Sequence, residues 1–217
     1  MAIEKHINFF GLQKASEKPG CPLCRIVSDH ADKYIDNTLF EHITNRGFRA
    51  LYRAAGGFCS FHSRHLVTFR DGLAIAILSR DILEDRIASF EKKSYWRPRG
   101  KCPVCAEKEK TEQEYLDFLS DSGGNSPEES ELREFFTASD GLCAPHYAGL
   151  LFLPGGKKRS VPAWLKDFQE QKFKKLKLRL DQFIELSAYG RQKEFAALDQ
   201  KDQLVWKEAA ACLNENI

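Results

Sequence analysis

The feature that most constrains this chain is a pair of cysteine motifs that occurs twice. The motif CPLC, which begins at Cys21, recurs 81 residues later as CPVC at Cys102. The motif GFCSFH, which begins at Gly57, recurs 84 residues later as GLCAPH at Gly141. Self-similarity at a fixed period indicates an internal repeat. We therefore predict a duplication in which each copy carries one CPxC and one CxxH motif.

Each copy supplies three cysteines and one histidine, a standard ligand set for structural zinc. The two-residue spacers let both end residues of a motif face one ion. With one site per copy, the sequence predicts two ligand sets: Cys21, Cys24, Cys59 and His62 in the first, and Cys102, Cys105, Cys143 and His146 in the second. Pairing of one copy's CxxC with the other copy's CxxH stays open.

Zinc is not the only occupant that such ligands accept. Soft thiolates also hold iron-sulfur clusters, so an electron-transfer protein with two clusters on the same eight residues is the alternative. A third interpretation makes CPLC and CPVC thiol-disulfide centres, but the chain has no βαβ pattern and the matched CxxH motifs argue against it. Because four protein ligands fill a tetrahedral zinc site, we expect a structural metal and neither hydrolase nor transferase activity.

Apolar spacing predicts an all-α fold. Val27, Ala31, Ile35 and Leu39 repeat every four residues after CPLC, and no segment alternates as a strand would. Further helices are expected over Phe48 to Ala55, Leu73 to about Lys93, Glu129 to Ala138, Pro162 to about Ala188, and 201–213. The segment Tyr95 to Lys101 is predicted to link the copies. We expect a pseudo-twofold protein with repeats at 1–98 (metal site 1) and 99–217 (metal site 2), packed as one compact domain.

Composition narrows the class of protein. The chain has 217 residues, 42% of them hydrophobic, and a net charge of +2, which is typical of a globular protein without a strong overall field. Its first residues lack the apolar run of a signal peptide, and no apolar stretch approaches the length of a membrane span. We therefore expect a cytoplasmic protein that does not enter membranes, and a reducing cytosol favours metal or thiolate chemistry over disulfides for its seven cysteines.

Other candidate residues carry weaker signals. His65 could replace His62 as a ligand, but Gly149 stands at the matching position of the second copy, so a core or surface histidine is expected. Cys212 is expected to be a small hydrophobe of the last helix. The basic segment Lys157 to Arg179, with Trp164 and Trp96, could bind nucleic acid, but a solvated helix face is favoured. A protein is the expected partner.

With these motifs in place, the chain resembles a functionally uncharacterised family of bacterial and archaeal proteins with duplicated CPxC and GxCxxH. The resemblance covers CPLC, GGFCSFH, LAIAILSRDIL, CPVC, GLCAPHY, and the ending from FIELSAY to VWKEAAACL. It departs at Leu186 to Tyr189, where KHDY is expected. The resemblance implies metal binding and the fold but no activity. We predict a metal-binding helical protein that acts as a binding or scaffold module.

Overall fold

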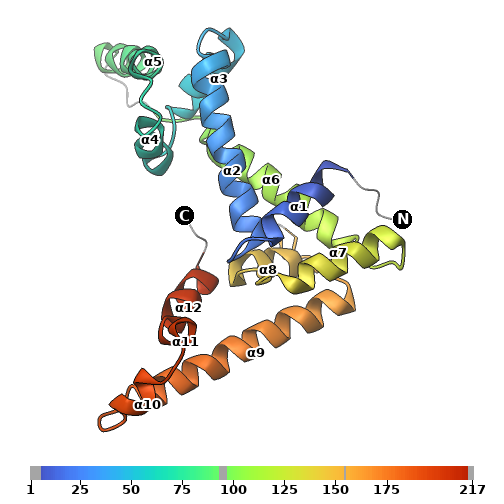
Figure 1. The fold of residues 1–217 in the computed structure, drawn as a ribbon. Helices are drawn as coiled ribbons and strands as arrows, with labels where there is room; N and C mark the ends of the chain where they lie inside the picture. Colours follow the sequence, from blue (N-terminus) through green and yellow to red (C-terminus); the bar gives the residue numbers. More distant parts are fainter. Residues whose placement is uncertain (1–5, 93–96, 154, 215–217) are drawn as a thin grey trace. The chain divides into compact units, whose positions relative to one another are not determined.

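The computed structural model describes residues 6–92, 97–153 and 155–214, and the regular structure in these ranges is helical (Figure 1). In chain order the elements are α1 (Ile7–Ser16), α2 (Pro22–Asn37), the π-helix η1 (Thr38–His42), α3 (Arg46–Ala55), α4 (Ser60–Val67), α5 (Gly72–Glu91), α6 (Pro103–Ser120), α7 (Pro127–Ala138), α8 (Ala144–Leu151), α9 (Ala163–Leu186), α10 (Gln192–Ala196), α11 (Gln200–Gln203) and α12 (Val205–Leu213). An isolated bridge joins Phe152 and Lys158, and no strand forms in the described ranges. The predicted all-α class is confirmed.

Polar side chains fix where several helices begin. Asn45 accepts the backbone N–H of Phe48 at the start of α3, and Asp71 accepts that of Ala74 at the start of α5. Ser126 and Glu129 form a reciprocal capping box before α7. These helices match the predicted ones, whereas α1, α4 and α8 were not predicted. The predicted linker from Tyr95 falls partly outside the described residues.

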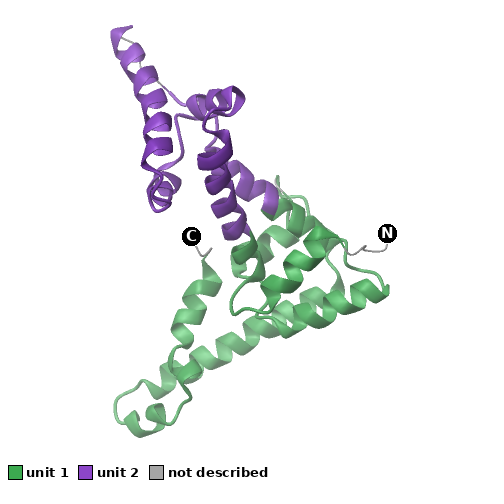
Figure 2. Ribbon diagram, turned by 45° about the horizontal axis from the view of Figure 1, so that its top comes forward, with its two compact units in different colours: residues 1–26, 112–217 green, residues 27–111 purple. Residues whose placement is uncertain are grey.

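The chain divides into two compact units, which Figure 2 colours separately. Unit 2 is the continuous segment 27–111, and unit 1 combines 1–26 with 112–217. Unit 2 is therefore inserted within the chain of unit 1. The predicted halves 1–98 and 99–217 do not coincide with these units, because each unit takes the CPxC motif of one copy and the CxxH motif of the other.

Each unit has a hydrophobic core of its own. The core of unit 1 is formed by residues of α1, the start of α2, α6, α7, α8 and α9, the most buried being Phe9, Leu12, Leu23, Leu119, Leu132, Phe136, Leu142, Leu150 and Leu165. The core of unit 2 is formed by α2, η1, α3, α4, α5 and the start of α6, and includes Ala31, Ile35, Leu39, Tyr52, Leu66, Leu78 and Val104. The stripe predicted after CPLC is thus confirmed as a core face.

Charge holds α3 on α5 in unit 2. Arg49 donates two hydrogen bonds to Asp81, and Arg53 donates two to Asp85. Asp81 is fully buried, and its hydrogen bonds from Arg49 lower the pKa of its carboxyl. The four residues lie at i and i+4 on each helix, so the two ion pairs form consecutive rungs between α3 and α5.

In unit 1, contacts between aromatic rings hold α7 on α9. Phe136 of α7 packs edge-on against Trp164 and Phe168 of α9, with ring centroids 6.2 and 5.8 Å apart. The guanidinium of Arg133 lies 5.5 Å from the centre of the Trp164 ring. Leu165 of α9 is fully buried in the core of unit 1, whereas Ile184 near the end of the helix is exposed.

The closing segment is helical as predicted, in the form of α11 and α12. Of its expected apolar residues, Val205 is fully buried, whereas Leu204, Trp206 and Leu213 are exposed. Helices α12 and α10 both pack on α9 within unit 1. No helix among the described residues has the length and hydropathy that crossing a bilayer would require.

Apart from η1, which follows α2 in the first copy alone, and the closing helices α10 to α12, both copies of the sequence have the same order of helices in the described residues. A helix that begins at CPxC is followed by a helix of 10 or 12 residues, then a short helix that begins at CxxH, and then the longest helix of that copy. This order is what a duplication requires. The duplication and the pseudo-twofold symmetry stay predictions.

Candidate metal centres

All eight predicted ligands lie at the starts of helices. Cys21 and Cys102 immediately precede α2 and α6, and the second cysteine of each CPxC lies in the first helical turn. Cys143 and Cys59 are the N-cap residues of α8 and α4. The unpaired N–H groups and positive dipole of a helix start favour thiolates. The proline of each CPxC is the first helical residue, where its missing N–H removes no bond.

The eight residues gather into two clusters, and the pairing is crosswise. Cluster 1, in unit 1, contains Cys21, Cys24, Cys143 and His146, and cluster 2, in unit 2, contains Cys59, His62, Cys102 and Cys105. The assignment of one complete set to each sequence copy is therefore wrong, and the alternative that the sequence left open is the one observed. The reason is the chain's topology, because the segment that carries Cys59 and Cys102 folds as a unit inserted between Cys24 and Cys143.

The ligand atoms of each cluster surround one point. In cluster 1 the Nδ1 atom of His146 lies 3.1, 3.3 and 3.5 Å from the Sγ atoms of Cys143, Cys24 and Cys21. The Sγ atoms of Cys24 and Cys143 are 3.5 Å apart. Within each cluster all four ligand atoms lie within 4.8 Å of one another. Either cluster could therefore hold a metal ion.

Cluster 2 repeats this geometry with less burial. The Nδ1 atom of His62 lies 3.2, 3.5 and 3.4 Å from the Sγ atoms of Cys59, Cys102 and Cys105. The Sγ atoms of Cys59 and Cys105 are 3.7 Å apart. These two cysteines are half-buried, whereas all four residues of cluster 1 are buried. Solvent therefore reaches cluster 2 more easily.

The backbone conformation explains why both GxCxxH motifs begin with glycine. Gly57 and Gly141 both have positive φ angles, +90° and +75°, a conformation that side chains disfavour. At Gly141 an added Cβ would also lie 2.9 Å from the side-chain oxygen of Gln169. The glycine lets the chain turn so that the cysteine two residues later caps the next helix.

Gln169 is a positioning residue that sequence reasoning missed. Its side chain accepts the backbone N–H of Leu142 and donates to the carbonyl of Leu142, both at 2.8 Å. Leu142 directly precedes the ligand Cys143, so α9 fixes the loop that delivers this ligand. The available signal was the position of Gln169, which interrupts the apolar face of α9 four residues after Leu165.

The two histidines differ in their surroundings. Burial lowers the pKa of His62. In His146, hydrogen bonds and negative charge from Cys21 and Cys24 outweigh burial and raise the pKa to about 10. Hydrogen bonds from Cys143 and Cys21 lower the pKa of the Cys24 thiol. Because metals bind thiolate and neutral imidazole, a metal entering cluster 1 must displace a proton from His146.

The outer nitrogens of the histidines differ as well. The Nε2 atom of His146 lies 3.8 Å from a carboxylate oxygen of Glu112. The Nε2 atom of His62 is buried and has no hydrogen-bond partner among the described residues. A carboxylate near the outer nitrogen of a ligating histidine orients the ring and raises its basicity. Cluster 1 has such a group, and it was not predicted.

The remaining candidates lie outside the clusters. His65 contacts Asp32, with 2.6 Å between Nε2 and a carboxylate oxygen, and it joins neither cluster. Cys212 is half-buried in α12, where burial raises the pKa of its thiol. All seven cysteines are free thiols.

The basic segment from Lys157 to Arg179 is largely engaged within the protein. Its internal partners are Asp117 for Arg159, the Ser139 carbonyl for Lys172, Glu170 for Lys174, Asp181 for Lys177, and Asp202 and Glu208 for Arg179. Trp164 donates its indole N–H to the carbonyl of Ser122. Trp96 lies outside the described residues. These contacts favour the interpretation of the segment as a helix face over a nucleic-acid site.

Comparison with known proteins finds a family model that matches part of the chain and an uncharacterised relative, and neither brings an activity. Residues 6–99 match the model of a family of unknown function, DUF6062. Over 131 residues the chain is 27% identical to an uncharacterised 23.9 kDa protein in the xynA 3' region of Caldicellulosiruptor sp. (strain Rt8B.4). This match covers 58% of the chain and 63% of the relative, less than two thirds of its length. No solved structure matches the chain.

The resemblance to a functionally uncharacterised family is thereby confirmed. The segment that matches the family model contains the first CPxC motif and the first CxxH motif. In the structure these two motifs belong to different clusters. A complete ligand set therefore needs residues beyond the matched segment.

Proposed function

We propose that each cluster binds one zinc ion and that the two ions stabilise the fold of a protein-binding module. The observation that carries this proposal is the spacing of the ligand atoms. A zinc ion with Zn–S bonds of about 2.3 Å in tetrahedral geometry places its sulfur ligands about 3.8 Å apart. The Sγ–Sγ distances of 3.5 Å in cluster 1 and 3.7 Å in cluster 2 fit that tetrahedron.

The same spacing weighs against iron-sulfur clusters. In such clusters the protein ligands bind different irons, which are separated by bridging sulfides. Their ligand atoms must spread beyond the edge of one tetrahedron, whereas four ligand atoms within 4.8 Å surround a single ion. A brown absorption spectrum of anaerobically purified protein, together with iron and labile sulfide in elemental and chemical analysis, would replace zinc with the electron-transfer alternative.

A structural role follows from the complete ligand set and its burial. Four protein ligands leave a tetrahedral ion no position for water or substrate. Cys21, Cys24 and Cys143 are also members of the unit 1 core. An ion in cluster 1 would therefore join the start of α2 to the start of α8 inside the core, and metal binding would contribute directly to folding. Cysteines that serve as metal ligands suit a reducing compartment such as the cytoplasm.

Double variants test the pairing and the stoichiometry together. Cys24→Ser with Cys143→Ser alters one cluster only, so the purified chain should retain about one zinc per molecule. Cys24→Ser with Cys59→Ser alters both clusters and should retain none. Elemental analysis after removal of loosely bound metal reads out both. If the Cys24→Ser, Cys143→Ser variant retained no zinc and the Cys24→Ser, Cys59→Ser variant retained about one, the ligands would pair within sequence copies. Two tightly bound ions in either variant would refute the ligand assignment.

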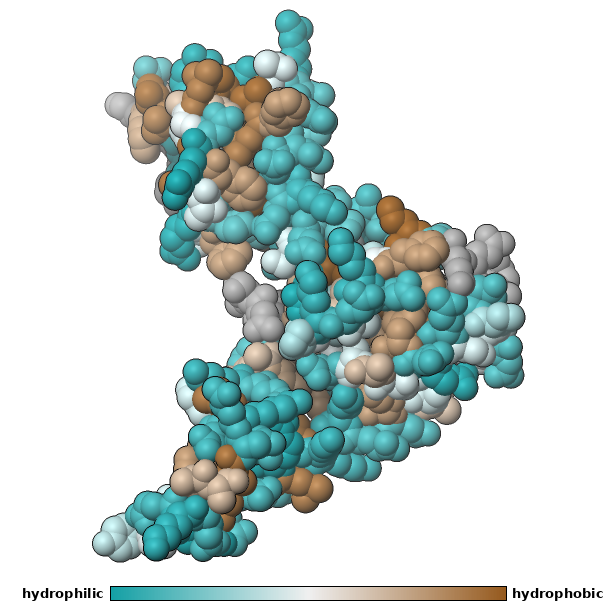
Figure 3. Space-filling view, in the orientation of Figure 1, coloured by the Kyte–Doolittle hydropathy of each residue, from teal (hydrophilic) through white to brown (hydrophobic). Residues whose placement is uncertain are grey.

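The exposed face of α5 supports a protein partner. Leu83, Ile87 and Phe90 lie at helical spacing and are exposed, as is Leu73 near the helix start. Figure 3 shows hydrophobic residues gathered on the face of unit 2 that carries α3 and α5. Arg80 and Glu84 form an exposed ion pair on the same helix. An apolar stripe bordered by both charges suits an amphipathic helix of a protein partner.

Site-specific crosslinking tests this partner. A photoreactive residue at Ile87 should crosslink to one protein through a helical segment, and Leu83→Glu should abolish binding of that purified protein. A probe at Leu178, an equally exposed leucine of α9, is the control. Crosslinks to a second copy of this chain would identify self-association instead, and salt-sensitive crosslinks to nucleic acid would favour the nucleic-acid alternative.

A further inference from the structure

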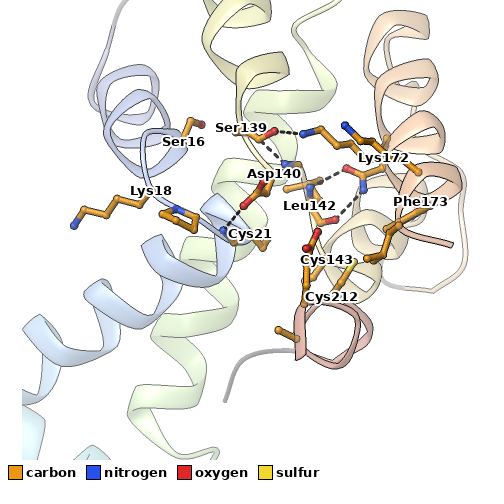
Figure 4. Close-up of a pocket in the computed structure, with 18 of the residues that line it drawn as sticks. Ser16, Lys18, Cys21, Ser139, Asp140, Leu142, Cys143, Lys172, Phe173 and Cys212 are labelled. Carbon is orange, nitrogen blue, oxygen red and sulfur yellow. Dashed lines mark hydrogen bonds between the residues drawn. The ribbon is translucent and has the colours of Figure 1, made fainter. Parts of the chain in front are cut away.

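Unit 1 contains a cavity of about 760 Å³ beside cluster 1 (Figure 4). Its walls come from the end of α1 and its connection to α2, the loop between α7 and α8, one side of α9, Lys201 of α11, and α12. Cys21 and Cys143 of cluster 1 contribute to the wall. The volume falls within the range of about 300–1,000 Å³ that is usual for small-molecule sites.

One part of the wall is apolar. Phe173 and Leu176 of α9 face the cavity together with Leu142 of the α7–α8 loop, and Ala211 and Cys212 of α12 complete this part. Leu142 is itself almost fully buried and is held in place by Gln169. The apolar part is therefore built on two helices and a fixed loop.

The other part of the wall is basic. Five basic residues line the cavity against three acidic ones, and the basic set is Lys18, Lys172, Lys175, Arg179 and Lys201. Two of the acids have partners already, because Glu208 pairs with Arg179 and Asp140 accepts the backbone N–H of Gly20 at 2.8 Å. The Nζ atom of Lys172 donates to the carbonyl of Ser139 at 2.6 Å, which fixes this ammonium at the wall.

A buried polar group points to a missing partner. Ser16 is 8% exposed, and its hydroxyl has no hydrogen-bond partner among the described residues. Ser16 lines the same cavity as Lys172 and Ser139. A buried hydroxyl without a partner destabilises the fold, and a ligand atom that accepts its hydrogen bond would remove that cost.

From these observations we propose that the cavity binds a small organic anion with an apolar body, of the class of alkyl or aryl carboxylates. The carboxylate lies beside Lys172 and accepts from Ser16, and the apolar body contacts Phe173, Leu176 and Ala211. The ligand binds the protein without reacting. This site is separate from the proposed docking face on α5, which belongs to unit 2.

Calorimetry with decanoate tests the site on the full metal-loaded chain. We expect saturable binding with one decanoate per chain. Lys172→Gln should weaken it at least tenfold, and Ala211→Trp should abolish it by filling the cavity. Two matched controls should bind as the unchanged chain does: Lys177→Gln, on the same helix but outside the cavity wall, and Ala210→Trp, the exposed neighbour of Ala211.

Three results would overturn the proposal. They are absence of saturable decanoate binding, unchanged binding in Ala211→Trp, and equal binding of the uncharged decanol. Zinc content and helix content are measured for each variant. Loss of zinc in a variant would show that cluster 1, and with it the proposed function, is affected. Loss of decanoate binding in a variant that retains zinc would show an effect on the cavity alone.

Discussion

The two units hold corresponding helices together by different chemistry. In unit 2, α3 is fixed on α5 by two Arg–Asp pairs, whereas in unit 1, α7 packs on α9 through Phe136, Trp164 and Phe168. Both units retain a Cys3His cluster of nearly the same spacing. Because the cluster in each unit fixes the starts of two helices, the other contacts between helices can differ between the two units.

The largest expected effect is on the clusters themselves. Cys143→Ser should unfold unit 1 and leave unit 2 protected, because structural zinc supplies folding free energy of about 10–16 kcal/mol in small zinc domains. Hydrogen exchange measured by mass spectrometry should show lost protection in α8 and α12 and retained protection in α3. Cys212→Ser, outside both clusters, is the control. Equal loss in both units would show that the units do not fold separately.

Removal of the central ring of unit 1 comes next. Phe136→Ala deletes a fully buried ring and should lower the free energy of unfolding by about 3–5 kcal/mol. Urea unfolding should give the same loss in low and high salt, because no charge is involved. Phe10→Ala, at an exposed ring, should change stability little. A strong salt dependence for Phe136→Ala would contradict the aromatic assignment.

The ion pairs of unit 2 should respond to pH. Asp81→Asn should destabilise by about 1.5–3 kcal/mol at neutral pH, the range for a hydrogen bond to a charged group. Because folding lowers the pKa of Asp81, its contribution is complete above the ordinary carboxyl pKa of about 3.9 and disappears as pH falls through the folded value. The difference between the two proteins should therefore vanish in acid.

The more exposed pair provides the comparison. Asp85→Asn removes a pair in which Asp85 is 26% and Arg53 38% exposed. Its effect should stay at or below about 1 kcal/mol, because solvent screens such pairs. If Asp81→Asn and Asp85→Asn destabilised the protein equally, the burial of Asp81 would not strengthen its ion pair.

The smallest expected effect is on the zinc affinity of cluster 1, through the carboxylate near the outer nitrogen, Nε2, of His146. Glu112→Gln should weaken zinc binding at cluster 1 by up to about tenfold, the lower end for groups that orient a ligating histidine. Competition with a chelator measures both sites in one titration, so cluster 2 serves as the internal control. An effect on both clusters would show that Glu112 acts on the fold as a whole.

The sequence predicted helices and ligands well because both leave local signals. The four-residue spacing after CPLC and the cap residues before α3, α5 and α7 are readable along the chain. The eight ligands are found from motif spacing alone. The short helices α4 and α8 were missed because eight residues beginning at a CxxH motif show too little periodicity to distinguish a helix from a turn.

The pairing of the ligands could not be predicted, because it depends on contacts between distant segments. Cys24 and Cys143 are 119 residues apart, and no local pattern near either residue identifies its partner. Gln169 and Glu112 were missed for a related reason. Each acts through one contact across the fold, and a single polar residue on a helix most often faces solvent.

The nested order of the ligands has a consequence for synthesis on the ribosome. Cys59 and His62 emerge when Cys21 and Cys24 are the only other ligands present, so the nascent chain first offers the within-copy set. The native inner set is completed at Cys105, and the outer set waits a further 41 residues until His146, about 2–8 s at ordinary elongation rates. A zinc ion captured early must therefore exchange two of its four ligands before either unit is complete.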